Sequence, residues 1–190
     1  MRSIEAPLTE ETVRGLKLGE IVSLAGPILT GRDEVHIRAL ENIDGGKPVP
    51  DCLRNAVIYH CGPIMRQEGD RWTVVAAGPT TSARMNKLEP RFIREFGIRA
   101  IIGKGGMNAE TVEAMKETGC VYLAATGGVA VSYAEGLGTC HGAEWDDLGM
   151  AESLWKFDAK GLGPLVVAID AHGNSLYAQV EEQVRKNRSQ

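Results

Sequence analysis

Short apolar runs, separated by turns that contain glycine or proline, recur along the chain and predict strands. They lie within residues 20–29, 56–61, 73–77, 98–102, 121–124 and 165–170. β-Branched and small residues dominate these runs, and Val22 and Leu24 alternate with small or polar residues as in a half-buried strand. Runs in the first half end in Gly-Pro or Thr-Gly pairs, which form turns. The first half of the chain is therefore predicted to be rich in strands.

Apolar residues at helical spacing lie between the later strands and predict helices. These helices are expected at residues 34–40, 89–96, 108–118 and 129–135. Asp33 stands where it would help to cap the first of them. One more helical face is marked by Leu148, Ala151, Leu154 and Trp155.

The order of these elements predicts the fold class. Strands and helices alternate in the second half, which is typical of βαβ units. We therefore expect an α/β fold in which a β-rich first half is joined to an alternating α/β second half, with residues 1–190 forming one domain. Residues 66–71 are expected to form a polar turn, and the charged tail at 180–190 is expected to fray.

Composition narrows the class of protein. Hydrophobic residues make up 43% and charged residues 24%, as in an ordinary globular protein. A net charge of -4 argues against a nucleic acid or an acidic membrane surface as the main partner. Residues 1–20 carry alternating charges rather than an apolar core, so we expect no signal peptide, no membrane span and a cytoplasmic protein. The cysteines lack metal-site spacing and are each expected to be small buried thiols: Cys52, Cys61, Cys120 and Cys140.

One segment stands out chemically. Residues 78–85 read Gly-Pro-Thr-Thr-Ser-Ala-Arg-Met and follow the apolar run 73–77, which fits a buried strand that ends at a sheet edge. Two further cations, Arg32 and Lys104, stand beside glycine at predicted strand ends, as Arg84 does here. Glycine lets the backbone approach a ligand closely, and arginine binds a carboxylate through two hydrogen bonds. The three cations suit a small anion with two carboxylates, whereas a plain Gly-Pro turn is the alternative for the segment alone.

Other residues near these turns offer weaker candidates. The Gly-Lys-Gly-Gly at 103–106 lacks the spacing and the Ser or Thr of a phosphate-binding P-loop, so nucleotide binding is a minor alternative. Thr80 or Thr81 could act as a base if a nearby cation lowered the cost of its alkoxide. His36 and His60 rank below the cations, because a polar helix surface and a hydrogen-bonded sheet position explain them more simply.

These motifs, in this order, resemble the β subunit, or C-terminal domain, of the iron–sulfur-dependent hydro-lyases, class I fumarate hydratase and L(+)-tartrate dehydratase. The resemblance covers nearly the whole chain. In the first half it rests on Gly-Pro-Ile-Leu-Thr-Gly-Arg-Asp at 26–33, Gly-Lys-Pro-Val-Pro at 46–50, Gly-Pro at 62–63, the segment 78–85 and Gly-Lys-Gly at 103–105. Later it rests on Tyr-Leu at 122–123, Gly-Gly at 127–128, Leu-Gly-Met-Ala-Glu at 148–152 and Ile-Asp at 169–170.

The resemblance implies a swivelling β/β/α domain that binds a dicarboxylate against a [4Fe-4S] cluster. Cysteines of a separate α subunit or N-terminal domain would hold that cluster and this chain would supply no metal ligand. Carried over by position, Thr80 is the proton-abstracting base and Lys104 a catalytic cation. The substrate would be bound by Arg32, Arg84, Thr81 and Gly105, with His36 and Asp33 as further candidates.

The activity implied by the resemblance is reversible hydration of a small dicarboxylate by a hetero-oligomer of this β subunit with its α subunit. Fumarate and (S)-malate are the first expectation, and L(+)-tartrate is the alternative. A stand-alone domain that binds small anions is the competing interpretation, and it needs no partner. Many relatives carry arginine or serine shortly after Gly105, where this chain has Gly106, Met107 and Asn108. That departure leaves the choice of diacid open.

Overall fold

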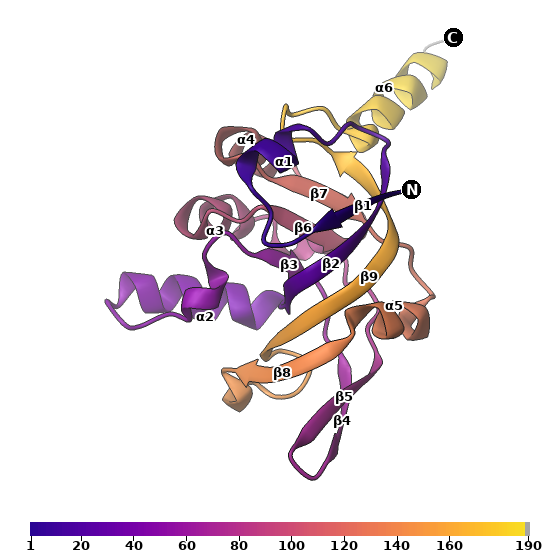
Figure 1. The fold of residues 1–190 in the computed structure, drawn as a ribbon. Helices are drawn as coiled ribbons and strands as arrows, with labels where there is room; N and C mark the ends of the chain where they lie inside the picture. Colours follow the sequence, from indigo (N-terminus) through magenta and orange to yellow (C-terminus); the bar gives the residue numbers. More distant parts are fainter. Residues whose placement is uncertain (189–190) are drawn as a thin grey trace.

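A seven-stranded mixed sheet organises the protein. The computed structural model describes residues 1–188. In pairing order the strands are β1 (Arg2–Glu5), β2 (Ile21–Thr30), β3 (Val57–Tyr59), β6 (Ala100–Gly103), β7 (Val121–Ala124), β9 (Leu154–Ile169) and β8 (Thr139–Glu144). Strand β9 also pairs antiparallel with β2, so β2, β3, β6, β7 and β9 form a closed ring of strand pairings (Figure 1). The long β9 crosses the molecule and joins the two ends of the ring.

Six α-helices accompany these strands within residues 1–188. They are α1 (Glu10–Arg14), α2 (Asp33–Asp44), α3 (Glu89–Phe96), α4 (Ala109–Thr118), α5 (Ala130–Leu137) and α6 (Leu176–Arg188). Helix α3 packs against both α2 and α4, and these three lie on the same side of the ring in Figure 1, whereas α5 packs on β9. The predicted α/β class is confirmed, and so are helices at the four predicted places.

The apolar runs bury both faces of the central strands. Tyr59 and Ile102 belong to the core enclosed by the ring, whereas Ile58 and Ile101, their neighbours in the chain, belong to the core shared with α2, α3 and α4. All four side chains are fully buried. Strands that are covered on both faces read as continuous apolar runs rather than as alternating ones. This is why the sequence pattern located these strands so clearly.

The predicted polar turn at 66–71 is wrong. Strands β4 (Ile64–Glu68) and β5 (Arg71–Ala76) form a separate two-stranded sheet, and the turn is confined to the two residues between them. Residues of β5 are alternately exposed and half-buried, so the run 73–77 is not the buried sheet strand that we expected. The polar residues of β4 face solvent, because this hairpin extends away from the body of the molecule (Figure 1).

The region before β9 also departs from expectation. The predicted helical face at 148–155 is wrong, since a single 3₁₀ turn at Asp146–Leu148 precedes Leu154 and Trp155, which open β9. Strand β8 was not predicted, because its sequence holds histidine, glycine and glutamate in place of an apolar run. The expected fraying of the tail is wrong for the described part, which is helical in α6, and 189–190 lie outside the described residues.

The four cysteines differ in burial. Cys61 and Cys120 are buried as expected, Cys140 is half-buried, and Cys52 is exposed, which corrects the expectation of a buried thiol at each position. Burial raises the pKa of the Cys61 thiol to about 12, although the nearby Arg32 opposes the shift. A thiol with so high a pKa is a poor source of the thiolate that metal clusters need.

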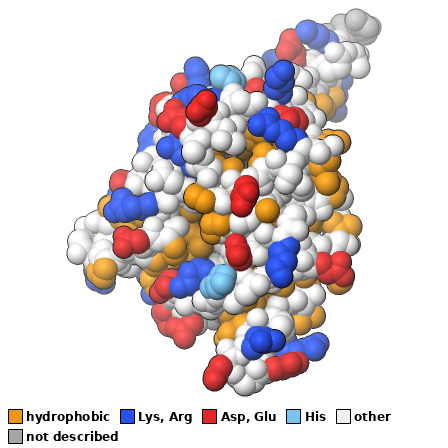
Figure 2. All heavy atoms as spheres, in the orientation of Figure 1, with side chains coloured by type: hydrophobic (Ala, Val, Ile, Leu, Met, Phe, Trp, Pro, Cys, Tyr) orange, Lys and Arg blue, Asp and Glu red, His pale blue; other side chains and the backbone are white. Residues whose placement is uncertain are grey.

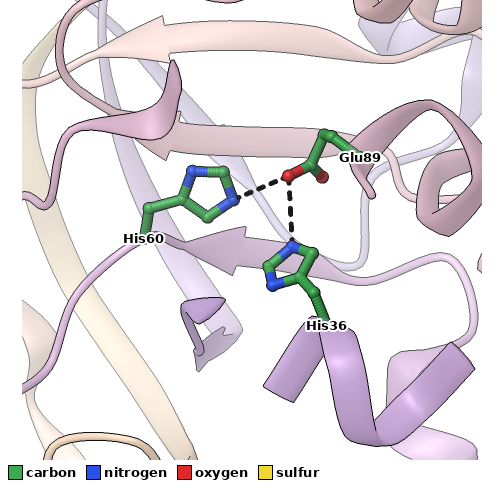
Figure 3. A group of neighbouring side chains, drawn as sticks. All are labelled: His36, His60 and Glu89. Carbon is green, nitrogen blue, oxygen red and sulfur yellow. Dashed lines mark ion pairs between the residues drawn. The ribbon is translucent and has the colours of Figure 1, made fainter. Parts of the chain in front are cut away.

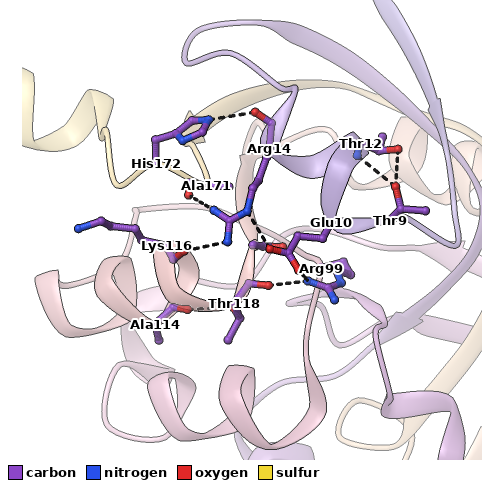
Figure 4. A network of polar contacts seen from close by, with 11 residues as sticks. Thr9, Glu10, Thr12, Arg14, Arg99, Ala114, Lys116, Thr118, Ala171 and His172 are labelled. Carbon is purple, nitrogen blue, oxygen red and sulfur yellow. Dashed lines mark hydrogen bonds and ion pairs between the residues drawn. The ribbon is translucent and has the colours of Figure 1, made fainter.

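Polar contacts fix α1 against the rest of the chain (Figure 4). The Arg14 guanidinium donates to the carbonyl oxygens of Ala171, at 3.1 Å, and Lys116, at 3.2 Å. The His172 ring contacts the carbonyl oxygen of Arg14 at 3.0 Å. These bonds join α1, α4 and the turn after β9, so they serve the fold.

On the face drawn in Figure 2, acidic and basic side chains are interspersed over the surface.

Candidate functional site

Three parallel strands end at one edge of the sheet, and each is followed by a chemically active residue. Thr30 at the end of β2 pairs in register with Tyr59 of β3, which pairs with Ile102 of β6. Arg32, His60 and Lys104 follow these strand ends directly or after one residue. The carboxyl ends of parallel strands are where α/β proteins commonly bind ligands. The expected gathering of site residues at a sheet edge is therefore found here.

The segment 78–85 lies across this edge. The Thr80 N–H donates to the carbonyl oxygen of His60 at 2.7 Å, and the Lys104 N–H donates to the carbonyl oxygen of Thr80 at 3.3 Å. The Ser82 N–H then donates to the carbonyl oxygen of Lys104 at 2.9 Å. These backbone bonds, with isolated bridges between Cys61 and Pro79 and between Thr81 and Lys104, hold the segment against the residues that follow β3 and β6, although β5, from which it comes, belongs to the hairpin.

Lys104 contacts the second threonine of this segment. Its ammonium group donates to Thr81 Oγ1 at 2.6 Å, and both residues are half-buried. Gly105 follows with φ +84°, and a Cβ added there would lie 3.3 Å from Thr81 Cγ2, so glycine keeps the turn close to the threonine. A cation that donates to a hydroxyl stabilises the alkoxide form of that hydroxyl. The structure thus gives Thr81, rather than Thr80, the cationic neighbour.

Arg84 lies in the 3₁₀ turn Ser82–Met85 and pairs with Asp33, with 3.0 Å between its Nη2 and Oδ2. Asp33 is the first residue of α2 and makes no side-chain cap, because Arg32 occupies the cap position, so its predicted capping role is wrong. The Arg84 side chain is 53% exposed and is therefore open to an incoming ligand.

Arg32 is paired as well, with the Glu152 carboxylate. Glu152 also accepts from the Glu34 backbone N–H at 3.3 Å, which holds it beside the start of α2. A Cβ on Gly62 would lie 3.0 Å from Arg32 Nη1 and 2.7 Å from the Ala151 carbonyl oxygen. The Gly-Pro at 62–63 therefore leaves room for the guanidinium, a role that the sequence alone did not indicate.

Beneath these groups lies a fully buried cluster of His36, His60 and Glu89 (Figure 3). Glu89 Oε2 is 3.1 Å from His36 Nε2 and 3.2 Å from His60 Nε2. The prediction that His36 lies on a polar helix surface is wrong. His60 lies directly after β3, where its backbone N–H donates to the Ile102 carbonyl oxygen and its ring contacts Ser82, as expected for a hydrogen-bonded sheet position. The sequence alone did not predict Glu89 as a residue of the site. A signal was present, because Glu89 precedes Phe92 and Ile93 by three and four residues and thus shares their buried helix face.

Charge pairing governs the ionisation of this cluster. Burial would raise the pKa of Glu89, but the two imidazoles outweigh it and hold that pKa at about 2. Burial would lower the pKa of His36, but Glu89 and the Arg32 carbonyl oxygen outweigh it, so the pKa of His36 is raised. The pKa of His60 is lowered, because burial and the charge of His36 together exceed the attraction of Glu89. The folded cluster therefore pairs one carboxylate with one imidazolium.

The same three side chains are the described residues that gather closely enough to hold a metal ion. Two imidazoles and a carboxylate suit zinc, which needs distances of about 2.0–2.2 Å from the ion to each ligand. In this structure one carboxylate oxygen lies 3.1 and 3.2 Å from the two nitrogens, a spacing that an ion pair gives and that a metal ion held between the three side chains would give as well. None of the four cysteines belongs to the group.

Cavities and helices elsewhere give little functional signal. A cavity of about 570 Å³ lies between the β4–β5 hairpin and β8, lined by Trp72, Cys140 and His141 among others, away from the cations. We place the site at the cations because their chemistry identifies an anion ligand, whereas the cavity offers size alone.

No helix within residues 1–188 combines the length and apolar character needed to cross a membrane.

Known proteins resemble the chain over almost its whole length. The profile of the family described as Fumarase C-terminus matches residues 2–180. A Methanocaldococcus jannaschii protein, provisionally named L(+)-tartrate dehydratase subunit beta, is 44% identical over 178 residues, which cover 93% of this chain and 91% of that protein. The L(+)-tartrate dehydratase subunit beta of Escherichia coli K12 is 38% identical, with coverage of 93% and 86%.

A third relative is longer than this chain. It is a Geobacillus stearothermophilus protein provisionally named fumarate hydratase class I, 41% identical over 189 residues, which cover 99% of this chain but 36% of that protein. A domain of this kind thus occurs both as a separate subunit and as part of a longer chain. With the match of the family profile, this shows that the chain belongs to the Fumarase C-terminus family.

Proposed function

We propose that this chain is the β subunit of a two-subunit hydro-lyase that reversibly hydrates and dehydrates a small dicarboxylate. The observation that carries the proposal is the set of three cations beside paired threonine hydroxyls at one sheet edge: Arg32, Arg84 and Lys104. Fumarate and (S)-malate are the first substrate pair to test. L(+)-tartrate is the second, favoured by the names of two of the relatives.

The two arginines suit the two carboxylates of such a substrate. In the absence of substrate each guanidinium is held by a carboxylate of the chain, Arg32 by Glu152 and Arg84 by Asp33. We infer that substrate carboxylates take over part of these bonds, since a guanidinium has five N–H donors and binds carboxylates through two at once. Asp33 and Glu152 then keep the arginines oriented before the substrate arrives.

Proton abstraction is assigned to the Thr80–Thr81 pair. The family resemblance points to Thr80, and the 2.6 Å contact with Lys104 favours Thr81. A hydroxyl is a weak base, and an ammonium group that donates to it lowers the cost of its alkoxide. Once a proton leaves the carbon beside a carboxylate, the developing negative charge is stabilised by the cations that hold that carboxylate. Gly105 leaves space for the threonine beside Lys104.

The remaining chemistry is assigned to a partner. The dispersed cysteines of this chain do not fit the ligand set of a [4Fe-4S] cluster, so we assign the cluster and the acid to an α subunit. When bound there, the cluster would act as a Lewis acid on the substrate hydroxyl. We further propose that residues 1–190 act as a single cytoplasmic domain that swivels against the α subunit. The location of the cations at a sheet edge, outside the large cavity, supports a site that a second protein completes.

The test is recovery of the assembled enzyme. The chain serves as bait in an anaerobic lysate of its source organism, and the eluate is assayed for malate–fumarate interconversion and for tartrate dehydration. Activity together with an iron-containing partner supports the proposal and identifies the substrate. If the chain is recovered alone and inactive but binds diacids, the stand-alone anion-binding interpretation replaces it.

Variants of the two threonines then identify the base. Loss of a general base lowers kcat by about 10²- to 10⁴-fold, so Thr80→Ala and Thr81→Ala are compared in the assembled enzyme. The variant with the large kcat loss contains the missing base, and a change in KM alone indicates a binding role. Thr73→Ala is the matched control, because this threonine lies on the exposed hairpin and bonds the Arg66 carbonyl oxygen there. Full activity in both test variants would remove the pair from the mechanism.

A further inference from the structure

The buried cluster of His36, His60 and Glu89 lies between the two arms of the site. One arm is the start of α2, which carries Arg32. The His36 Nδ1 atom is 2.8 Å from the carbonyl oxygen of Arg32. The other arm is the segment 78–85, and the His60 Nδ1 atom is 2.9 Å from Ser82 Oγ in that segment. Each imidazole therefore faces Glu89 through one nitrogen and an arm of the site through the other (Figure 3).

Counting protons assigns charges to this cluster. A carbonyl oxygen and an ionised carboxylate only accept hydrogen bonds, so both nitrogens of His36, which face the Arg32 carbonyl and Glu89, carry hydrogen. His36 is then an imidazolium. Tyr122 donates to Ser82 Oγ at 3.0 Å, which leaves the Ser82 hydrogen for Nδ1 of His60. Burial and the charge of His36 lower the pKa of His60, which agrees with a neutral His60 that accepts from Ser82, so the buried cluster carries no net charge.

We propose that Glu89 is a positioning residue, which holds the Arg32 arm and the threonine arm in register through His36 and His60. Its catalytic consequence rests on the proposed hydro-lyase function. Glu89 acts at a distance from the substrate, through groups that are themselves fixed. The Thr80 backbone N–H donates to the carbonyl oxygen of His60, so the same histidine also holds the threonine backbone.

Burial makes the cluster sensitive to the charge of Glu89. All three side chains are fully buried, so water cannot replace a lost partner. In a Glu89→Gln variant the paired carboxylate is gone, and the weaker attraction of Asp33 does not hold an imidazolium in a fully buried site, so His36 loses a proton. A neutral His36 can keep only one of its two donor contacts, so the bond to the Arg32 carbonyl and the contact with residue 89 compete. The arm that carries Arg32 would shift relative to the arm that carries the threonines.

The first experiment uses the chain alone and follows the histidines by ¹⁵N NMR as the pH is raised. In the wild type one imidazole should stay doubly protonated to a higher pH than any imidazole in Glu89→Gln. Glu95→Gln is the matched control, because Glu95 lies on the same helix but pairs with Arg91 at the surface. Unchanged histidine signals in Glu89→Gln would overturn the charge assignment. One equivalent of a divalent metal ion, bound by the wild type and lost in Glu89→Gln, would overturn it as well.

The second experiment measures kcat and KM in the assembled enzyme. A displacement of about 1 Å in a catalytic group costs up to about 10²-fold, so kcat of Glu89→Gln should fall roughly 10- to 100-fold, with a smaller change in KM. Glu95→Gln should match the wild type. Equal kcat values for the two variants would overturn the positioning role. If the wild type itself hydrates no diacid, the proposed function fails, while the NMR result still stands for the cluster.

A second variant keeps the inference testable if Glu89→Gln does not fold. Ser82→Ala leaves the pair of His36 and Glu89 intact and removes the side-chain contact of His60 with the segment 78–85, together with the bond from Tyr122. The backbone bond from the Thr80 N–H to the His60 carbonyl oxygen is kept. The doubly protonated signal of His36 should remain, and kcat should fall more than KM rises. An unchanged kcat in Ser82→Ala would show that the His60 side chain does not position the catalytic segment, and the threonine half of the proposal would fail.

Discussion

Gly103 is the position at which the packing around the site can be tested most directly. It ends β6, and a Cβ built on it would lie 2.0 Å from Ser82 Oγ, 3.2 Å from the Tyr122 hydroxyl and 3.4 Å from His60 Nδ1. Its φ is not in the left-handed region, so alanine brings no backbone strain of that kind. The effect of Gly103→Ala should therefore come mainly from the clash with Ser82, with a smaller part from the tight contact with the Tyr122 hydroxyl.

The expected size follows from these contacts. Overpacking a buried site costs about 1–3 kcal/mol, which in a chain of this length lowers Tm by roughly 2–4 °C for each kcal/mol. Ser82→Ala removes the atom at 2.0 Å but leaves the hydrogen-bonding groups of His60 and Tyr122 without that partner, at about 1–3 kcal/mol. Because the clash disappears with Ser82 Oγ, the double variant should cost at least ~1 kcal/mol less than the sum of the single variants.

The assay is reversible denaturant unfolding of the wild type, the two single variants and the double variant. Gly127→Ala is the control, because a Cβ there meets only Lys104 Cδ at 3.8 Å, an ordinary contact, and its φ is also outside the left-handed region. We expect the control to change the free energy of unfolding by no more than about 0.5 kcal/mol. Additive costs of Gly103→Ala and Ser82→Ala would refute the reasoning, since they would mean that the two atoms do not compete for space.

Three further predictions concern charge and the turn after Lys104. Because the folded pKa of Glu89 is about 2 against an ordinary 4.5, stability should be fully present above pH 4.5 and fall by about 3 kcal/mol toward pH 2; unfolding of Glu89→Gln across this range should lack that component. Arg84→Ala should lower kcat/KM of the assembled enzyme roughly 10- to 150-fold, and an unchanged value would remove Arg84 from the site. Gly106→Ala should destabilise the fold by at least ~1 kcal/mol in thermal unfolding, since φ is +73° and a Cβ would lie 2.7 Å from the Tyr177 ring.

The geometry at Gly106 also explains the departure from the family pattern that the sequence raised. Any side chain at this position would meet the ring of Tyr177, at the start of α6, and would strain a left-handed backbone. Glycine at 106 is therefore accounted for by packing in this chain. The choice of diacid remains a matter for the activity assay.

The parts of the fold that depend on neighbours in the chain could be predicted. Continuous apolar runs indicate buried strands such as β3, β6 and β7, and the glycine turns after β2 and β6 identify Arg32 and Lys104. A strand such as β8 could not be found in this way. It holds few apolar residues, and its pairing with β9 supplies the stability that its own sequence lacks.

The parts of the site that depend on segments far apart in the chain could not be predicted from the sequence pattern. Nothing local indicates that Glu89 lies between His36 and His60, because three separate elements bring them together. For the same reason, the sequence could not decide whether Thr80 or Thr81 contacts Lys104. Which hydroxyl faces Lys104 depends on how the segment 78–85 bonds the residues that follow β3 and β6, and the order of residues does not contain that information.

The closure of the ring by β9 has a consequence for how the protein acquires its site. Ile21 at the start of β2 pairs with Val166 near the end of β9, so the closing contacts join opposite ends of the chain. Contacts between residues so far apart raise the contact order and slow folding. On the ribosome, every residue of the site is synthesised before the strand that closes the ring. A growing chain therefore contains every residue of the proposed site before the fold can position those residues, and ligand binding should arise only after β9 has docked.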